Sequence, residues 1–285
     1  MSNPNSADQF RKLCEQMNET IRPIVRRSVT PIGAIPKGGQ TMQFGTGTFF
    51  SLGESSFLVT AGHVWTKAQK YGFELCIFDG DAGRLDESPL TEVSLDGQIH
   101  FTKDVADVAV IELDRKTVER LPNRHFLRLQ EVSLKAESPG WCWVYGFPQS
   151  MTEFHPQSAT LRFNELMLGA QFSSEGQYLE NYDGTKHFLL DARRDSLERA
   201  DGSPGTLPDE LNGISGGSIW QALWPGQSLE LPWDSSKLRI VGVQTSYYAD
   251  SSLIRATHWG AIAHILYRRK PELRSILEFH LGRAF

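Results

Sequence analysis

From Phe44 onward the chain consists of short apolar runs of strand length, separated by residues that favour turns. The runs are Gly45–Ser51, Ser56–Thr60, Phe73–Phe78, Val108–Leu113, Trp141–Phe147, Thr160–Met167, His187–Leu190, Gly217–Leu223 and Leu238–Thr245. Many short strands with few helices between them are typical of sandwiches and barrels, whereas parallel sheets alternate strands with helices. The sequence therefore predicts an all-β fold.

A helix is expected at each end of the β body. The stretch from Ala7 to Thr20 has apolar side chains at helical spacing, and Pro271 opens a second stretch with Leu273, Ile276, Leu277 and Leu281 on one face. Residues 113–139 contain no strong strand, so they are expected to connect two halves. We expect a helix and linker over 1–40, one β subdomain over 41–125, a second over 126–268, and a helix over 269–285.

Composition narrows the class of protein. The chain has 285 residues, of which 40% are hydrophobic and 22% charged, with a net charge of −5 and no long basic run. Nucleic acid is therefore a poor partner, and no apolar run is long enough to predict a membrane-spanning helix. The polar start and three widely spaced cysteines predict a cytoplasmic protein with reduced thiols. Cys142, between two tryptophans, is predicted to pack rather than react.

Three short motifs supply the groups of one catalytic chemistry. They are Thr60-Ala61-Gly62-His63, Asp107-Val108-Ala109-Val110 and Gly213-Ile214-Ser215-Gly216-Gly217. A serine hydroxyl is a poor nucleophile near neutral pH unless an imidazole takes its proton and a carboxylate orients the imidazole. Glycine at 213 would let the backbone N–H groups of residues 213 and 215 point at a developing oxyanion.

From Phe44 to Leu266 the sequence resembles the trypsin-like serine peptidases of chymotrypsin fold, particularly the disulfide-poor bacterial and intracellular members. The resemblance implies two antiparallel β-barrels and a serine endopeptidase that needs no cofactor. It implies that Ser215 is the nucleophile, His63 the general base and Asp107 the acid that orients it, with Asp104 as the fallback. Gly213 and Ser215 would form the oxyanion hole.

The resemblance also suggests how a polypeptide substrate binds. The strand Ile240–Ser246 looks like the family's strand that pairs with substrate backbone, and Thr245 and Ser246 lie at its end. Asp209 lies six residues before Ser215, where trypsin-like members carry the acid that selects Lys or Arg. Ile214 replaces the acid that pairs with a new N-terminal amine in zymogen-activated relatives. Regulation is therefore expected through loops or through a partner protein at the terminal helices.

Two other functions fit parts of the pattern. One is a binding or scaffold protein that keeps the barrels without turnover. The other is an α/β-hydrolase esterase, in which Ser215 would be followed by Asp250 and by His258 or His264. The segment after Ser215 is too short for the helix that this fold requires. The remaining histidines show no paired ligand spacing, so no metal is expected.

Overall fold

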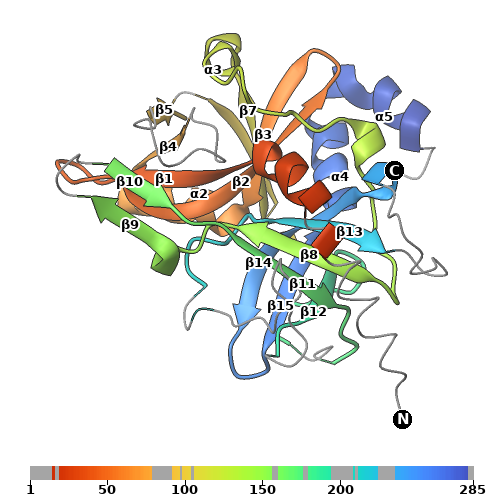
Figure 1. Ribbon diagram of the computed structural model, residues 1–285. Coiled ribbons are helices and arrows are strands. Elements are labelled where there is room, and N and C mark those ends of the chain that lie inside the picture. The colour runs from red at the N-terminus through yellow and green to blue at the C-terminus, as the bar shows by residue number, and fades with distance from the viewer. Residues whose placement is uncertain are drawn as a thin grey trace.

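The computed structural model is an all-β protein built on two antiparallel sheets (Figure 1). It describes residues 15–16, 19–78, 92–96, 98–103, 106–155, 160–175, 179–193, 208, 211–223 and 235–281. Each sheet curls into a half of a chymotrypsin-like double barrel, as the resemblance to the trypsin-like serine peptidases implies. The all-β prediction is confirmed.

The first sheet has seven strands in the order β5-β4-β1-β2-β3-β7-β6. Its strands are β1 (Val29–Ile35), β2 (Met42–Leu52), β3 (Ser55–Ala61), β4 (Glu74–Phe78), β5 (Glu92–Ser94), β6 (Ile99–Lys103) and β7 (Val108–Leu113). The central hairpin of β2 and β3 pairs Thr48 with Val59, and β3 then pairs Ala61 with Val108 of β7. The ends of β3 and β7 thus lie side by side, which brings the segments of His63 and Asp107 together.

The second sheet has six strands in the order β11-β8-β13-β14-β15-β12. Its strands are β8 (Trp141–Gly146), β11 (Leu166–Gln171), β12 (His187–Asp191), β13 (Ser218–Leu223), β14 (Arg239–Tyr248) and β15 (Leu253–His258). A separate hairpin is formed by β9 (Thr152–His155) and β10 (Thr160–Phe163). The strand β13 begins directly after the Gly-rich motif, so the sheet fixes the end of that loop.

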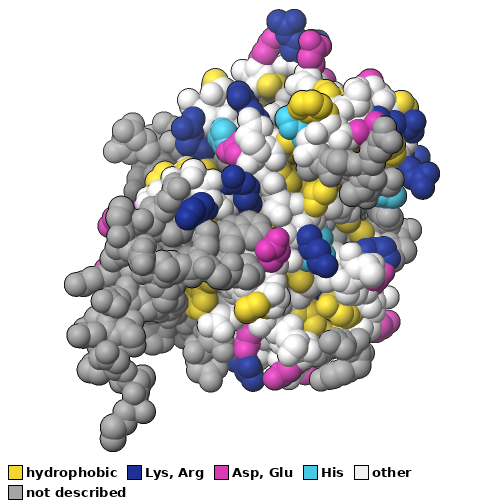
Figure 2. Space-filling view, turned by 90° about the vertical axis from the view of Figure 1, so that its right-hand side faces the viewer, with side chains coloured by type: hydrophobic (Ala, Val, Ile, Leu, Met, Phe, Trp, Pro, Cys, Tyr) yellow, Lys and Arg dark blue, Asp and Glu magenta, His cyan; other side chains and the backbone are white. Residues whose placement is uncertain are grey.

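Helices are short and lie outside the sheets. They are α2 (Gly62–Tyr71), α3 (Arg115–Glu119), α4 (Trp259–Arg269) and α5 (Arg274–Leu281), with single 3-10 turns η2 (Leu129–Glu131), η3 (Gln149–Met151), η5 (Ser235–Lys237) and η6 (Pro271–Leu273). None of the helices that the structure describes is long and apolar enough to cross a bilayer. On the described part of the face in Figure 2, basic and acidic side chains are interspersed with hydrophobic ones.

A shared core joins the two sheets. The largest apolar cluster contains Phe50 and Val59 from the first sheet, Trp143 and Tyr145 from the second, and Trp259 from α4. Burying a large apolar side chain contributes roughly 1.5–3 kcal/mol, so a core spanning both sheets holds them in one arrangement. Residues contributed by both halves can therefore form a single, well-positioned site.

Three local features differ from the sequence-based expectation. Residues 29–35, which lie in the predicted helix and linker over 1–40, form β1, and residues 19–28 are helical although the predicted helix ends at Thr20. The helix α4 (Trp259–Arg269) occupies the end of the segment assigned to the second barrel. Turn-forming residues gave the wrong indication because tertiary contacts override them. Pairing of β1 with β4 begins only at Ile32, just after Pro31.

The helical residues 19–28 are anchored to the second barrel through Glu165. Arg22 and Arg26 both form ion pairs with the Glu165 carboxylate, and the Tyr145 hydroxyl donates a hydrogen bond to it. The Glu165 side chain is 7% exposed. Removing its charge would therefore leave the two arginines and the Tyr145 hydroxyl without the anion that compensates them. Arg22 and Arg26 therefore dock this helix on the second barrel.

Replacing Glu165 with glutamine should lower the free energy of unfolding by about 2 kcal/mol, because two cations and a buried hydroxyl lose their shared anion. Urea denaturation of wild type and Glu165→Gln would measure this. The matched control is Glu119→Gln, which removes an exposed i,i+4 pair with Arg115 and should cost less than about 0.5 kcal/mol. Equal costs for the two variants would contradict the anchoring role of Glu165.

Two buried histidines predict a loss of stability in acid. His187 on β12 and His258 at the end of β15 are 1% and 5% exposed, and burial lowers the pKa of each from 6.5 to about 4. The unfolded chain therefore binds protons on these side chains below about pH 6.5 while the folded chain does not. Stability should fall as the pH decreases from 6.5 to 4, by at most about 3 kcal/mol per histidine.

The variant His258→Asn tests this pH dependence. Asparagine keeps an acceptor for the Ala136 N–H, which His258 Nδ1 accepts at 3.1 Å, but it cannot take up a proton. Between pH 6.5 and 4, the slope of unfolding free energy against pH should become clearly shallower than in wild type, measured by urea denaturation at several pH values. The exposed His280→Asn is the control, and a slope unchanged in both variants would refute the prediction.

Candidate active site

His63 lies at the start of α2, directly after β3 ends. Ala61 is extended and Gly62 opens the helix, so the chain turns sharply from the sheet into the helix at this point. The Gly62 N–H donates to the Asp107 carbonyl at 2.8 Å, and a Cβ on Gly62 would approach the Asp107 carbonyl carbon to 3.1 Å. Glycine at 62 therefore lets the backbone that carries Asp107 come close to His63.

The Asp107 carboxylate holds both the backbone and the ring of His63. Its Oδ1 accepts the His63 N–H at 2.9 Å, and its Oδ2 lies 2.9 Å from His63 Nδ1. An ionised carboxylate only accepts, so the contact places the ring proton on Nδ1 and leaves Nε2 with a lone pair. The pair is partly open to solvent, with side-chain exposures of 29% for His63 and 20% for Asp107. This tautomer is the one that a general base requires.

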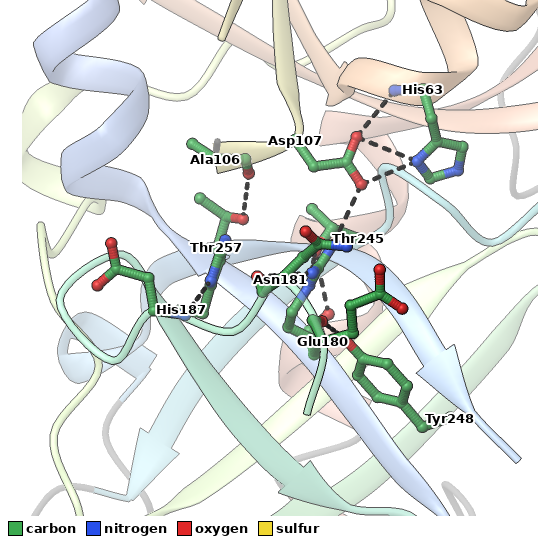
Figure 3. A network of polar contacts seen from close by, with 11 residues as sticks. His63, Ala106, Asp107, Glu180, Asn181, His187, Thr245, Tyr248 and Thr257 are labelled. Carbon is green, nitrogen blue, oxygen red and sulfur yellow. Dashed lines mark hydrogen bonds and ion pairs between the residues drawn. The ribbon is translucent and has the colours of Figure 1, made fainter. Parts of the chain in front are cut away.

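A second layer of polar groups supports Asp107 from the other barrel, as Figure 3 shows. Arg255 Nη2 lies 3.4 Å from Asp107 Oδ2, and Arg255 Nε donates to Thr245 Oγ1 at 3.2 Å. The hydroxyl of Thr257 donates to the Ala106 carbonyl at 2.6 Å, which fixes the residue before Asp107. The acid thus lies on the seam and is held by residues of both halves.

The Gly-rich loop that carries Ser215 packs on the segment leading to His63. Thr46 N–H donates to the Ser215 carbonyl at 2.8 Å, and Gly216 N–H donates to the Gln244 carbonyl at 2.8 Å. A Cβ on Gly216 would overlap the Thr46 carbonyl oxygen and the Thr60 hydroxyl, and its φ is +91°. Glycine at 216 is therefore required both by the backbone angle and by the close approach of the two halves.

The carbonyl groups of Asn212 and Gly213 are both held by hydrogen bonds, which fixes the backbone before Ser215. The Asn212 carbonyl accepts the Gln149 N–H at 2.6 Å, and the peptide plane then turns the Gly213 N–H to the opposite side. The Gly213 carbonyl is held by Thr46 Oγ1 at 2.9 Å and by Gln43 Nε2 at 3.4 Å. Among the described residues, the N–H groups of Gly213 and Ser215 donate to no other group. Both amides are thus available to a ligand oxygen.

The structure brings together some of the predicted residues more closely than others. No hydrogen bond joins the Ser215 hydroxyl to His63 within the described part of the chain. Asp209 and the fallback acid Asp104 lie outside the described residues. His63 and Asp107 are in contact, and the backbone of the Ser215 loop adjoins the segment leading to His63.

Thr245 and Ser246 lie at a β-bulge in β14. The register with β15 shifts between Gln244 and Ser246, which leaves Thr245 as the extra residue. Thr245 is 1% exposed and reaches Asp107 only through Arg255, so its side chain supports the acid and does not line the surface. Ser246 is half-buried. Pairing with β13 ends at Val243, and the backbone of Gln244 bonds to Gly216 and Gly217, so the residues of β14 after Gln244 have one unpaired edge among the described strands.

The alternative nucleophiles and ligand sets find no support. Cys142 is fully buried, and burial raises the pKa of its thiol. Burial is also the main reason that the pKa of the Cys76 thiol rises to about 12. The antiparallel all-β architecture excludes the α/β-hydrolase hypothesis, in which Asp250 and either His258 or His264 would follow Ser215. Within the described ranges, no group of three His, Cys, Asp or Glu side chains is arranged to hold a metal.

Solved structures identify the architecture. The protease-like S-I1 protein of the scabies mite, described as an inactivated protease paralogue, matches with a TM-score of 0.51 at 12% identity, covering 88% of this chain and 96% of that one. The chain has the chymotrypsin-like fold. The serine protease domain of the Sesbania mosaic virus polyprotein matches at a TM-score of 0.44 and 16% identity, over 83% of this chain and 91% of that chain. No protein-family model and no curated protein matches the sequence.

Within this chymotrypsin-like fold, sequence reasoning missed three residues of the site. Arg255 appears in an ordinary strand, and Gln43 and Gln149 occupy polar positions without a motif. Gln43 is 3% exposed, and its Nε2 donates to the Gly45 carbonyl at 2.7 Å and the Phe147 carbonyl at 2.9 Å, joining the two halves. Gln43 contacts Phe147, which lies more than 100 residues away along the chain. No local pattern in the sequence could therefore have indicated its role.

Proposed function

We propose that this protein is a serine endopeptidase in which Ser215 attacks the peptide bond and His63 is the general base. The observation that carries the proposal is the Asp107–His63 contact of 2.9 Å at Nδ1, which in the neutral ring directs the lone pair to Nε2. The free amides of Gly213 and Ser215 support it. Catalytic hydrogen bonds are often long without substrate, so the open Ser215–His63 contact is compatible with this role.

The proposed reaction proceeds through an acyl-enzyme. Ser215 Oγ bonds to the substrate carbonyl carbon as the hydroxyl proton passes to His63 Nε2. The new oxyanion accepts hydrogen bonds from the N–H groups of Gly213 and Ser215. His63 then gives the proton to the leaving amine as the C–N bond breaks. Water, deprotonated by His63, attacks the ester and releases Ser215 with its proton restored.

A polypeptide in extended conformation suits the surface beside this site. The edge of β14 after Gln244 has unpaired backbone groups among the described strands, and a substrate strand would add there through main-chain hydrogen bonds. Tyr247 and Tyr248 are half-buried at the same edge. Preference for Lys or Arg at the cleaved bond, through Asp209, remains a part of the proposal that rests on the sequence offset alone.

The loop around Ser215 supports a site that needs no N-terminal salt bridge. Ile214 is 1% exposed and lies in an apolar cluster with Val144, Leu166 and Ile219, where the zymogen-type relatives have an acid. Apolar packing and the carbonyl contacts from Gln43 hold the loop instead. This arrangement, together with the buried thiols of Cys76 and Cys142, supports kinship with the disulfide-poor members of the fold.

The rival function is a binding or scaffold protein with silent barrels. The mite protein has this architecture and is described as an inactivated protease paralogue, so the architecture alone does not establish turnover. In this chain the histidine, the aspartate and the serine all occur, in the chain order that the resemblance implies. We therefore favour the peptidase.

Cleavage of a peptide library, read by mass spectrometry, tests the proposal. Wild type should cut the library, and Ser215→Ala should not, because the proposed mechanism uses the hydroxyl of residue 215 as its nucleophile. The control Ser133→Ala removes a hydroxyl that bonds to Lys135 and should leave cleavage unchanged. Equal cleavage by wild type and Ser215→Ala would overturn the proposal, and the residues before the cut sites would test the preference for Lys and Arg.

A further inference from the structure

A buried guanidinium lies directly behind the candidate acid. Arg255, on β15, is 5% exposed and keeps its positive charge at every pH at which a protein folds. A buried charge costs free energy unless an opposite charge and hydrogen-bond acceptors compensate it. The groups that compensate Arg255 therefore show what this residue does.

All three kinds of nitrogen in the Arg255 side chain are engaged. Nε donates to Thr245 Oγ1 at 3.2 Å, Nη1 donates to the Asn181 carbonyl at 3.0 Å, and Nη2 lies 3.4 Å from Asp107 Oδ2. Two neutral acceptors fix the plane of the guanidinium, and Asp107 is the carboxylate that it meets among the described residues. The same Oδ2 lies 2.9 Å from His63 Nδ1.

The other charged groups around Arg255 have partners of their own or are neutral near pH 7. Asp183 is paired with Lys186 and accepts a hydrogen bond from Thr185. The pKa of His187 is lowered to about 4 by burial and then by the charge of Arg255. Glu180 is exposed and holds Tyr248 only through its backbone carbonyl. The charge of Arg255 therefore acts on the Asp107 carboxylate and, through this carboxylate, on His63.

We propose that Arg255 is a positioning residue that shares the Asp107 carboxylate with His63 and sets the pH range in which His63 acts as a base. The inference rests on the proposed function. The guanidinium partly neutralises the carboxylate, so addition of a second positive charge to the imidazole is less favourable than it would be beside Asp107 alone. Without the guanidinium, protonation of the ring beside Asp107 is expected to become more favourable, and the carboxylate is expected to lose one of the contacts that orient it.

The rate of labelling by a fluorophosphonate, measured against pH, tests this role without a known substrate. In Arg255→Met the pH of half-maximal rate should rise by about 1 unit, because the competing charge is gone. In Arg255→Lys, which keeps a charge, it should stay within about 0.3 units of wild type, given the same charge rule. The change should appear near neutral pH, well above the range in which His187 titrates.

Further variants separate this role from a structural one. Arg255→Gln keeps a donor for Thr245 without the charge, and should show the same rise if Arg255→Met does not fold. Arg124→Met removes another buried guanidinium, which donates to the carbonyls of Val29 and Phe78, and should lower stability without moving the profile.

The outcomes distinguish the two proposals. A wild type labelled on Ser215, with an unchanged profile in folded Arg255→Met or Arg255→Gln, would overturn the role of Arg255 and leave the peptidase intact. A rise in these variants that Arg255→Lys does not share would support it, and a folded wild type that the probe does not label at any pH would overturn both.

Discussion

Asp107→Asn should lower kcat by about 10⁴-fold in a chain that still folds, although loss of the charge opposite the buried Arg255 should also lower its stability. The amide of asparagine would present a donor to His63 Nδ1, which would have to become the acceptor, and the ring proton would move to Nε2. Imidazole in that tautomer cannot take the Ser215 proton. Steady-state hydrolysis of a peptide identified in the library would measure the loss.

Asparagine is the sharpest substitution because of the backbone at this position. Asp107 has a φ of +48°, a region that Asn and Asp tolerate better than other residues with side chains. An alanine would add backbone strain to the loss of the carboxylate. The matched control is Asp250→Asn, which alters the acid of the excluded hydrolase reading and should leave kcat within about twofold, because surface changes far from such a site have small effects. A fall of less than tenfold in Asp107→Asn would contradict the assignment.

Gly216→Ala should lower the free energy of unfolding by at least about 3 kcal/mol, from the left-handed backbone and the overlap together. The added methyl would meet the Thr46 carbonyl and the Thr60 hydroxyl, which belong to the hairpin that leads to His63. Neither the backbone oxygen nor the buried hydroxyl can withdraw without breaking the contact between the two halves. Urea denaturation followed by tryptophan fluorescence would measure the cost.

Gly38→Ala is the control for the backbone angle alone. Gly38 has a φ of +70°, and no atom lies within 4 Å of the position that a Cβ would take, so alanine there should cost only about 1 kcal/mol. The difference between the two variants isolates the close packing at Gly216. If both variants lost the same stability, the seam would not be as tightly packed as the contacts of Gly216 indicate.

The parts of the fold that follow local rules could be predicted from the sequence. Short strands and the glycines near Ser215 are encoded within a few residues of one another, whereas the helix α2 after Gly62 was not predicted. Chain order then allowed His63 and Asp107 to be paired, and the structure places them in contact. The roles proposed for them remain to be tested by activity.

The parts that depend on distant contacts could not be predicted in the same way. Pro31 and Gly33 are turn-forming residues, yet β1 forms because β2 and β4 pair on either side of it. The helix over 19–28 persists past Pro23 because Glu165, far along the chain, binds its arginines. Arg255 is one residue of an apolar strand, and its role follows only from the bulge at Thr245 and the approach of Asp107.

The central claim is that the hydroxyl of Ser215 becomes a nucleophile because His63 and Asp107 act on it from the other half of the molecule. Incubation with a fluorophosphonate, followed by mass spectrometry of the intact protein and its peptides, tests this most directly. We expect one adduct per chain, on Ser215, formed much more slowly in His63→Ala and not at all in Ser215→Ala. A folded wild-type protein that remains unmodified, or that is modified at another residue, would contradict it.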